Sequence, residues 1–164
     1  MCAVKSLAWI ILVGLALSGG AAGAPQNELK TLLQDYLKGP LGGADKTTRF
    51  RTASAFLKHG SAEQTIVFVI GKQWCSARGC TLLVVSNNEV ISKTIGVSPP
   101  VVVLPEISNG WHDLGIRSAE GAKRLTFNGW RYPINAYSFP AQRMSKDQAG
   151  KIAIPTSPDT AALY

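Results

Sequence analysis

Residues 65–86, TIVFVIGKQWCSARGCTLLVVS, decide how this chain folds. Two apolar, β-prone runs, at 65–71 and 81–86, flank a polar loop that holds two cysteines. Short apolar runs of this composition, bounded by polar residues and glycine, are typical of buried central strands. The short loop between them predicts that the two strands are antiparallel neighbours in one sheet.

Short extended segments continue on both sides of this pair. Residues 49–57 alternate loosely between apolar and charged side chains, with the period of two that a strand has. Further strands are expected at 90–95, 101–105, 111–118, 123–127 and 130–134. The Pro99-Pro100 step is expected to break the chain between the first two of these. Asn128-Gly129, which separates the last two, is a strong hairpin signal.

Residues 27–38 predict one amphipathic helix before the strands. Asn27 can cap its start, and Gly39-Pro40 stops it. Its apolar side chains recur with the helical period, at Leu29, Leu32, Leu33, Tyr36 and Leu37. We therefore expect an α+β fold, in which an N-terminal amphipathic helix packs on a mainly antiparallel β meander of about six to eight short strands.

Residues 1–24 have the three-part plan of a secretory signal peptide. Lys5 precedes an apolar run at 7–17, and small residues follow it. The run is shorter than the roughly 20 apolar residues of a membrane helix, so we expect no membrane span after processing. Cleavage is expected after Ala21, Ala22 or Ala24. The sequence then divides into a single helix-plus-sheet domain at 25–134 and a proline-rich C-terminal extension at 135–164, which either wraps the domain or hangs free.

Export has consequences for charge and for the cysteines. The formal net charge of +7 falls to 7 − 1 = +6 when Lys5 leaves. In the periplasm or outside the cell, Cys75 and Cys80 are expected to form a disulfide. A zinc site is less favoured, because two thiolates are only half of the ligands and neither histidine is close in sequence. A redox-active pair is disfavoured by the four intervening residues, since such pairs have two.

The stretch from Trp74 to Pro133 resembles a group of small exported bacterial proteins. The shared pattern is a C-x4-C turn that enters a strand, then N-G-W-x-D-L and F-x-G-x-x-Y-P, here at 75–80, 109–114 and 127–133. In that group the first turn is rich in glycine, whereas Ser-Ala-Arg-Gly in this chain places Arg78 at the tip. The resemblance implies a shared fold and an exported location, and it implies no particular activity.

Catalytic chemistry finds little support in the sequence. There is no G-x-S-x-G elbow, no metal-binding spacing of histidines and acids, and no phosphate-binding glycine loop. His112 and Asp113 could form a base with its orienting acid, but neighbours on a strand point to opposite faces. We therefore predict a protein that is not an enzyme and that has no catalytic residues, cofactor or metal.

Surface character points instead to binding. Tryptophan and arginine at loop tips are the residue types that dominate interfaces. The candidate binding residues are Trp74, Arg78, Trp111, His112, Trp130 and Arg131. The alternative for each tryptophan is that it caps the end of a small core.

The positive charge favours an acidic protein surface or an anionic envelope polymer as partner. Nucleic acid is excluded by the exported location and by the lack of a recognition motif. The leading hypothesis is a periplasmic or secreted binding protein, specifically an inhibitor or immunity-type protein that acts on an envelope-targeting enzyme. The alternative is a structural envelope domain that binds peptidoglycan or anionic lipid. A small hydrolase with an unrecognised site is the third.

Overall fold

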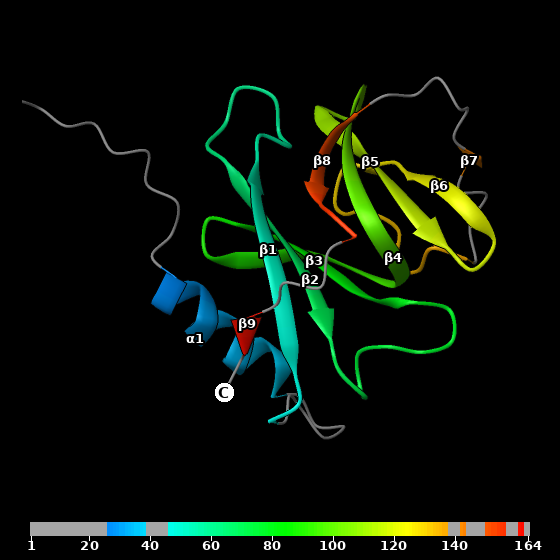
Figure 1. Ribbon diagram of the computed structural model, residues 1–164. Helices are drawn as coiled ribbons and strands as arrows, with labels where there is room; N and C mark the ends of the chain where they lie inside the picture. Colours follow the sequence, from blue (N-terminus) through cyan, green and yellow to red (C-terminus); the bar gives the residue numbers. More distant parts are fainter. Residues whose placement is uncertain (1–25, 39–45, 138–141, 144–149, 157–160, 163–164) are drawn as a thin grey trace, which may run out of the picture.

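The computed structural model describes residues 26–38, 46–137, 142–143, 150–156 and 161–162 (Figure 1). The predicted signal peptide and its three cleavage positions lie outside the described residues. The elements are α1 (Gln26–Leu37), β1 (Arg49–Ala55), β2 (Gln64–Ile70), β3 (Cys80–Ser86), β4 (Glu89–Ser108), β5 (Trp111–Ser118), β6 (Gly121–Leu125), β7 (Gln142–Arg143), β8 (Lys151–Ile154) and β9 (Ala161–Ala162).

Strands β1 to β7 lie beside one another in chain order, and each neighbouring pair is antiparallel. This confirms the expected antiparallel meander with one short N-terminal helix. The sheet bends at β4, so that β5 and β6 form a second layer over β1 to β3 (Figure 1).

The apolar runs of β2 and β3 are continuous because both faces of these strands are buried. Ile66 and Phe68 point into the core between the two layers. Val67 and Val69 point to the other side, where they pack against the helix through Leu33 and its apolar neighbours. Alternate side chains of a strand point to opposite faces, so a strand covered on both sides needs an apolar residue at nearly every position.

The expectation that Pro99-Pro100 breaks the chain into two strands is wrong. β4 runs through both prolines as one 20-residue strand. Its first half pairs with β3, and its second half pairs with β5 and β8. The prolines cannot donate ladder hydrogen bonds, and the register with β5 shifts between Ser98 and Val102. The prolines therefore mark the place where the strand passes from one layer to the other.

The strand expected at 130–134 is also not formed. This segment instead hydrogen-bonds along the free edge of β4. The Tyr132 amide donates to Ser92 Oγ at 3.1 Å, and the Ile95 amide donates to the Ile134 carbonyl at 2.8 Å. Pro133 has no amide hydrogen, which limits the segment to isolated bonds. It thereby closes one side of the core between the layers.

The described parts of the C-terminal extension pack on the domain. β7 pairs with β6, β8 pairs with the second half of β4, and β9 pairs with the start of β1. Ile154 of β8 is buried in the core between the layers. In these ranges the extension therefore adds strands to both layers of the sheet.

Candidate functional site

The loop between β2 and β3 is closed by a covalent bond. Cys75 and Cys80 form the expected disulfide, with their Cα atoms 3.9 Å apart. Inside it, the amide of Ser76 donates to the carbonyl of Gly79 at 2.9 Å, and the amide of Gly79 donates back at 3.1 Å. The Arg78 amide donates to Ser76 Oγ at 3.1 Å. The loop is therefore held by its own hydrogen bonds as well as by the disulfide.

Gly79 presses this loop against β4. Its φ of +124° is a conformation that side-chain-bearing residues rarely adopt. A Cβ atom at this position would lie 2.6 Å from the carbonyl oxygen of Val97. Only glycine permits this close approach of two backbones. The tip of the disulfide loop is thus seated on the sheet and does not project freely from it.

Arg78 is exposed, yet its side chain has two neighbours. Its guanidinium carbon lies 4.5 Å from the centroid of the Tyr137 ring, a cation–π arrangement. Glu120, in the turn between β5 and β6, lies within its electrostatic reach. The pKa of Glu120 lies below its ordinary value, first because Lys123 donates it a hydrogen bond and also because Arg78 contributes positive charge. Arg78 is therefore an oriented cation at the surface.

Trp74 lies at the base of the same loop, half-buried on the helix side of the sheet. The ammonium of Lys93 lies 5.5 Å from the centroid of its ring. The indole Nε1 is buried and has no hydrogen-bond partner among the described residues. Thr48, directly before β1, lies close to Gly71, where a Cβ would be 3.3 Å from the Thr48 Cα. This brings the basic residues near the start of β1 close to the loop.

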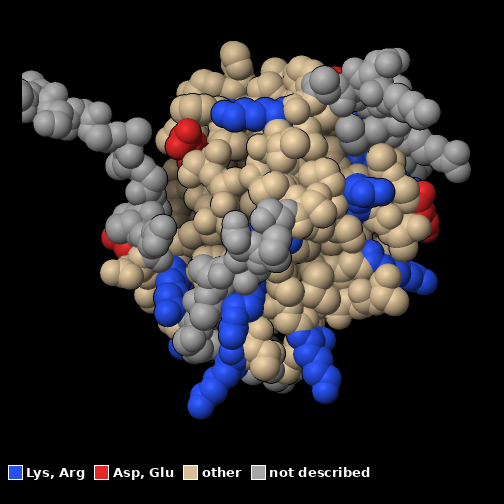
Figure 2. Space-filling model, viewed as in Figure 1, with Lys and Arg blue, Asp and Glu red and all other residues tan. Residues whose placement is uncertain are grey.

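Basic side chains gather around this end of the molecule. Figure 2 shows several Lys and Arg side chains along the lower edge of the face, below α1 and β1, with no Asp or Glu visible among them. Residues at this end that carry positive charge include Lys46, Arg49, Lys72, Arg78 and Lys93. We call the loop Trp74–Cys80, together with Lys93, Glu120 and Tyr137, the disulfide end.

Trp111 does not belong to this surface. It is only 8% exposed, and its ring stacks on Phe127 with 4.6 Å between centroids. Tyr132 meets Phe127 edge-on at 5.2 Å and completes an aromatic cluster in the core. Trp111 therefore caps the core, as the alternative interpretation of the tryptophans expected.

Trp130 and Arg131 lie in a tight turn that follows β6, and both are exposed, Trp130 by 85%. Asn128 holds this turn, because its Oδ1 accepts hydrogen bonds from the amides of both residues at 2.9 Å. Trp130 is thus fixed in place by its backbone, while its ring contacts little of the protein.

The predicted binding residues consequently fall into two groups. Trp111 and His112 begin β5, whereas the turn that contains Glu120 follows its last residue. An 8-residue strand spans roughly 25 Å at about 3.3 Å per residue. Trp74 and Arg78 lie at the disulfide end, and Trp111, His112, Trp130 and Arg131 lie at the other.

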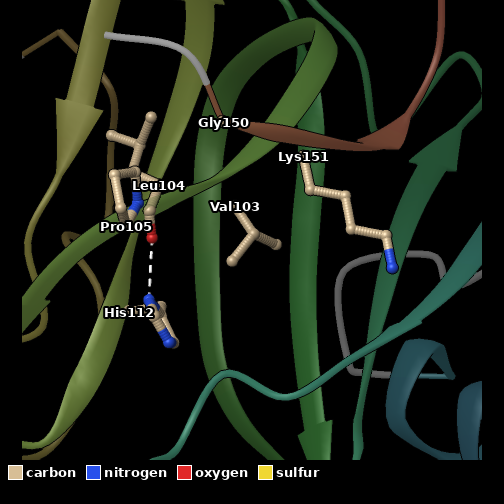
Figure 3. Close-up of a pocket in the computed structure, with 6 residues that line it drawn as sticks. All are labelled: Val103, Leu104, Pro105, His112, Gly150 and Lys151. Atoms are coloured by element: carbon tan, nitrogen blue, oxygen red, sulfur yellow. Dashed lines mark hydrogen bonds between the residues drawn. The ribbon is translucent and has the colours of Figure 1, made fainter.

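His112 lines a shallow hollow of about 360 Å³ between β4, β5 and β8 (Figure 3). Its Nδ1 lies 2.8 Å from the carbonyl oxygen of Leu104, which can only accept, so Nδ1 carries the hydrogen and Nε2 keeps its lone pair in the neutral ring. Lys151 also lines the hollow, but its side chain leads away from His112, with Val103 between them (Figure 3). Asp113 points to the opposite face, where it accepts a hydrogen bond from Arg124 Nε at 2.6 Å.

The described lining of the hollow holds no acidic residue, and its lysine, Lys151, does not reach His112. Likewise, the described part of the chain contains no group of three or more His, Cys, Asp or Glu side chains that could hold a metal ion. The arrangement at the disulfide end is instead one of cations and aromatic rings, the residue types that dominate interface hot spots.

Sequence reasoning missed Tyr137, Lys93 and Glu120. Tyr137 and Lys93 contact the disulfide loop, and Glu120 comes within electrostatic reach of Arg78, only because the sheet folds back on itself. Their positions in the sequence carry no motif. Composition is the one sequence signal for such a site, because cations and aromatic residues each outnumber acids in this chain.

Comparisons with protein-family models, with curated proteins and with solved structures find no match for this chain. Among the described residues, no helix is both long and apolar enough to cross a membrane. The interpretation of the site therefore rests on its own geometry and charge.

Proposed function

We propose that this protein is an exported, non-enzymatic binding protein that docks its disulfide end onto an acidic site of another macromolecule. In its most specific form it is a periplasmic or secreted inhibitor, or an immunity-type protein, of an envelope-targeting enzyme. Arg78 is the residue that enters the partner's acidic site, and the ring of Trp74 borders the contact.

The observation that carries this proposal is the rigid presentation of an exposed arginine. The Cys75–Cys80 disulfide and the hydrogen bonds between Ser76 and Gly79 hold the loop, and Tyr137 orients the Arg78 guanidinium. Docking a loop that is already ordered loses little conformational entropy. Arginine can also form paired hydrogen bonds with a carboxylate, which gives both affinity and orientation.

Charge supports an acidic partner. Lys93 and Arg78 lie on the two sides of the loop, and the whole chain carries more basic than acidic residues. A basic surface of this kind attracts an acidic cleft over a distance and speeds the encounter. It also disfavours basic proteins as targets, because like charges repel.

The test is an affinity pull-down from envelope extract with the mature, oxidised protein at low and at moderate salt. We expect one stoichiometric protein that remains bound at moderate salt. Arg78→Ala should lose most of it and should still fold, with a melting temperature lowered only by the loss of its contact with the Tyr137 ring. Arg131→Ala, which removes an exposed arginine at the other end, is the matched control and should bind normally. Equal binding by wild type and Arg78→Ala would overturn the proposal.

A structural envelope domain that binds peptidoglycan or anionic lipid is the second candidate, and the basic lower edge in Figure 2 favours it. Adsorption through diffuse charge should fall steeply with ionic strength, because the screening length shortens from about 10 Å at 0.1 M salt to about 3 Å at 1 M. A hydrolase is the least supported candidate, since Lys151, the other ionisable residue in the described lining of the hollow, leads away from His112 (Figure 3).

A further inference from the structure

Three loops meet at the end of the molecule opposite the disulfide end. They are the β1–β2 connection at 56–63, the β4–β5 turn at 109–110 and the segment 126–131. The His59 amide donates to the Gly110 carbonyl at 3.0 Å, and Asn109 Nδ2 donates to the Phe127 carbonyl at 2.7 Å. Figure 1 shows the first two side by side at the upper end. We call these three segments the loop end.

The loop end exposes two large aromatic side chains. Phe56 is 62% exposed and Trp130 is 85% exposed, so each projects into solvent from its own loop. Both loops adjoin Trp111, because Lys58 pairs with its backbone and Phe127 stacks on its ring. The two aromatic tips therefore project from the same end of the protein.

Each aromatic tip has a cation close to it in the chain. Lys58 lies two residues after Phe56, and Arg131 follows Trp130; both are exposed. His59 is exposed beside Lys58. Among the described residues of the three loops, Glu63 is the only acid. The loop end thus combines apolar tips with excess positive charge.

These tips are rigid. The side chain of Gln64 is buried inside the β1–β2 connection, and its Oε1 accepts hydrogen bonds from the amides of Leu57 and Lys58 at 2.7 and 2.9 Å. Its Nε2 donates to Ser61 Oγ at 2.9 Å. In the other loop, Asn128 Oδ1 likewise accepts hydrogen bonds from backbone amides, those of Trp130 and Arg131. Because these hydrogen bonds fix the loop backbones, the loops cannot rearrange to bury Phe56 and Trp130 against the domain.

We propose that the loop end docks on the surface of an anionic phospholipid bilayer. Phe56 and Trp130 enter the boundary between headgroups and acyl chains, and Lys58 and Arg131 contact lipid phosphates. Tryptophan prefers this boundary because its ring is apolar while its N–H can still hydrogen-bond. Lysine and arginine near an anionic membrane add electrostatic attraction. This surface shares no residue with the disulfide end, so either proposal can fail alone.

The arrangement fits a bilayer better than a protein partner. Phe56 and Trp130 belong to separate loops, and protein interfaces of ordinary affinity need a contiguous face of about 800 Å² per partner. A lipid surface is fluid and closes around each projecting side chain separately. The cations beside the tips also complement the negative charge of lipid phosphates, whereas an apolar groove of a protein would offer them no counter-charge.

The first experiment is vesicle co-sedimentation of the mature, oxidised protein. Vesicles of phosphatidylcholine with one-third phosphatidylglycerol are compared with pure phosphatidylcholine at moderate salt. We expect binding to the anionic vesicles, and an affinity at least tenfold lower for the double variant Phe56→Ala, Trp130→Ala. Ile152→Ala, which removes an exposed apolar side chain from β8, is the matched control and should bind within about twofold of wild type.

Fluorescence gives a second, independent measurement. Trp130 is exposed, so its emission should shift to shorter wavelength on vesicle addition and should be quenched by lipids brominated on their acyl chains. Trp130→Phe should lose both changes and should keep most of its vesicle binding.

Two results would overturn the proposal. One is the absence of binding to anionic vesicles. The other is binding that persists in the double variant and disappears in Arg78→Ala, which would show adsorption through the disulfide end. Circular dichroism and the melting temperature of each variant separate loss of binding from loss of folding.

Discussion

The guanidinium of Arg78 lies 4.5 Å from the centroid of the Tyr137 ring, so the tip of the disulfide loop rests on a residue far along the chain. Tyr137 is itself tied to the sheet, because the amide of its neighbour Ala136 donates to the Ile95 carbonyl at 2.9 Å. The edge of Tyr137 also covers Gly96, where a Cβ would lie 2.8 Å from the ring. The orientation of Arg78 therefore depends on how the segment after β6 packs.

Replacement of Tyr137 by leucine should weaken partner binding while the fold persists. The variant removes the π face under the guanidinium, which contributes about 0.5–1 kcal/mol at an exposed site. Urea unfolding should show a loss of unfolding free energy of that size. Partner binding should fall because Arg78 is no longer oriented. Tyr36→Leu, a half-exposed tyrosine on α1, is the control. Unchanged partner binding in Tyr137→Leu would show that the contact has no role in recognition.

The disulfide should stabilise the domain modestly. Cross-linking so short a loop contributes about 2 kcal/mol through the entropy of the unfolded chain. We expect the double variant Cys75→Ser, Cys80→Ser to fold, because the buried members of both apolar clusters are other side chains. Its free energy of unfolding should be lower by about that amount. Reductant should lower the stability of wild type and leave the double variant unaffected; failure of the double variant to fold would contradict this account.

Gly79→Ala should destabilise the protein more than Gly129→Ala. Both glycines have positive φ, a conformation that costs a side-chain-bearing residue about 1–2 kcal/mol. Gly129 faces open space, whereas a Cβ at Gly79 meets the backbone of Val97. A backbone atom cannot move aside, so overpacking should add about 1–3 kcal/mol at Gly79. If chemical denaturation gave equal losses of unfolding free energy for Gly79→Ala and Gly129→Ala, the disulfide loop would not be tightly packed on β4.

Tyr132 should make the fold sensitive to alkaline pH. Burial raises the pKa of its hydroxyl, and the negative charge of Asp113 raises it further. The folded state keeps the phenol neutral, whereas the unfolded chain ionises near pH 10. The stabilisation is therefore complete below about pH 10 and falls as the pH rises above it, by about 1.4 kcal/mol per pH unit.

The measurement is urea unfolding between pH 8 and 11. Tyr132→Phe should be less stable at pH 8, because it loses the hydrogen bond to the His112 carbonyl, and it should show a shallower decline at high pH. Burial also raises the pKa of Tyr36, so Tyr36→Phe is compared in parallel and should keep the steeper part of the decline. Identical slopes in wild type and Tyr132→Phe would contradict the assignment.

Several elements could be predicted from local sequence because their physical cause is local. The period of Leu29 and Leu33 marks one apolar helix face, and the apolar runs of β2 and β3 mark strands buried on both sides. The pairing of Cys75 with Cys80 follows from their nearness in the chain and from the expected exported location. Apart from the export signal at 1–24, each inference depends only on residues within a few positions of one another.

The errors arose where distant segments decide the outcome. Pro99 and Pro100 cannot donate backbone hydrogen bonds, but whether a strand stops or bends there depends on the partners available. Here β3 supports one half of β4 and β5 supports the other, so the strand continues. Segment 130–134 failed to become a strand because only isolated hydrogen bonds to β4 were open to it.

The sequence by itself determined the helix face, the central strands and the disulfide. The helical period of apolar residues, the apolar runs and the spacing of the two cysteines are all properties of short stretches of chain. Only the tertiary structure decided which tryptophan is buried, since Trp111 and Trp130 have similar neighbours in sequence and differ in whether Phe127 covers the ring. It also placed the candidate binding residues at two opposite ends. Burial and proximity are properties of packing between layers, and the bend of β4 that creates those layers is set by hydrogen-bond partners far away in the chain.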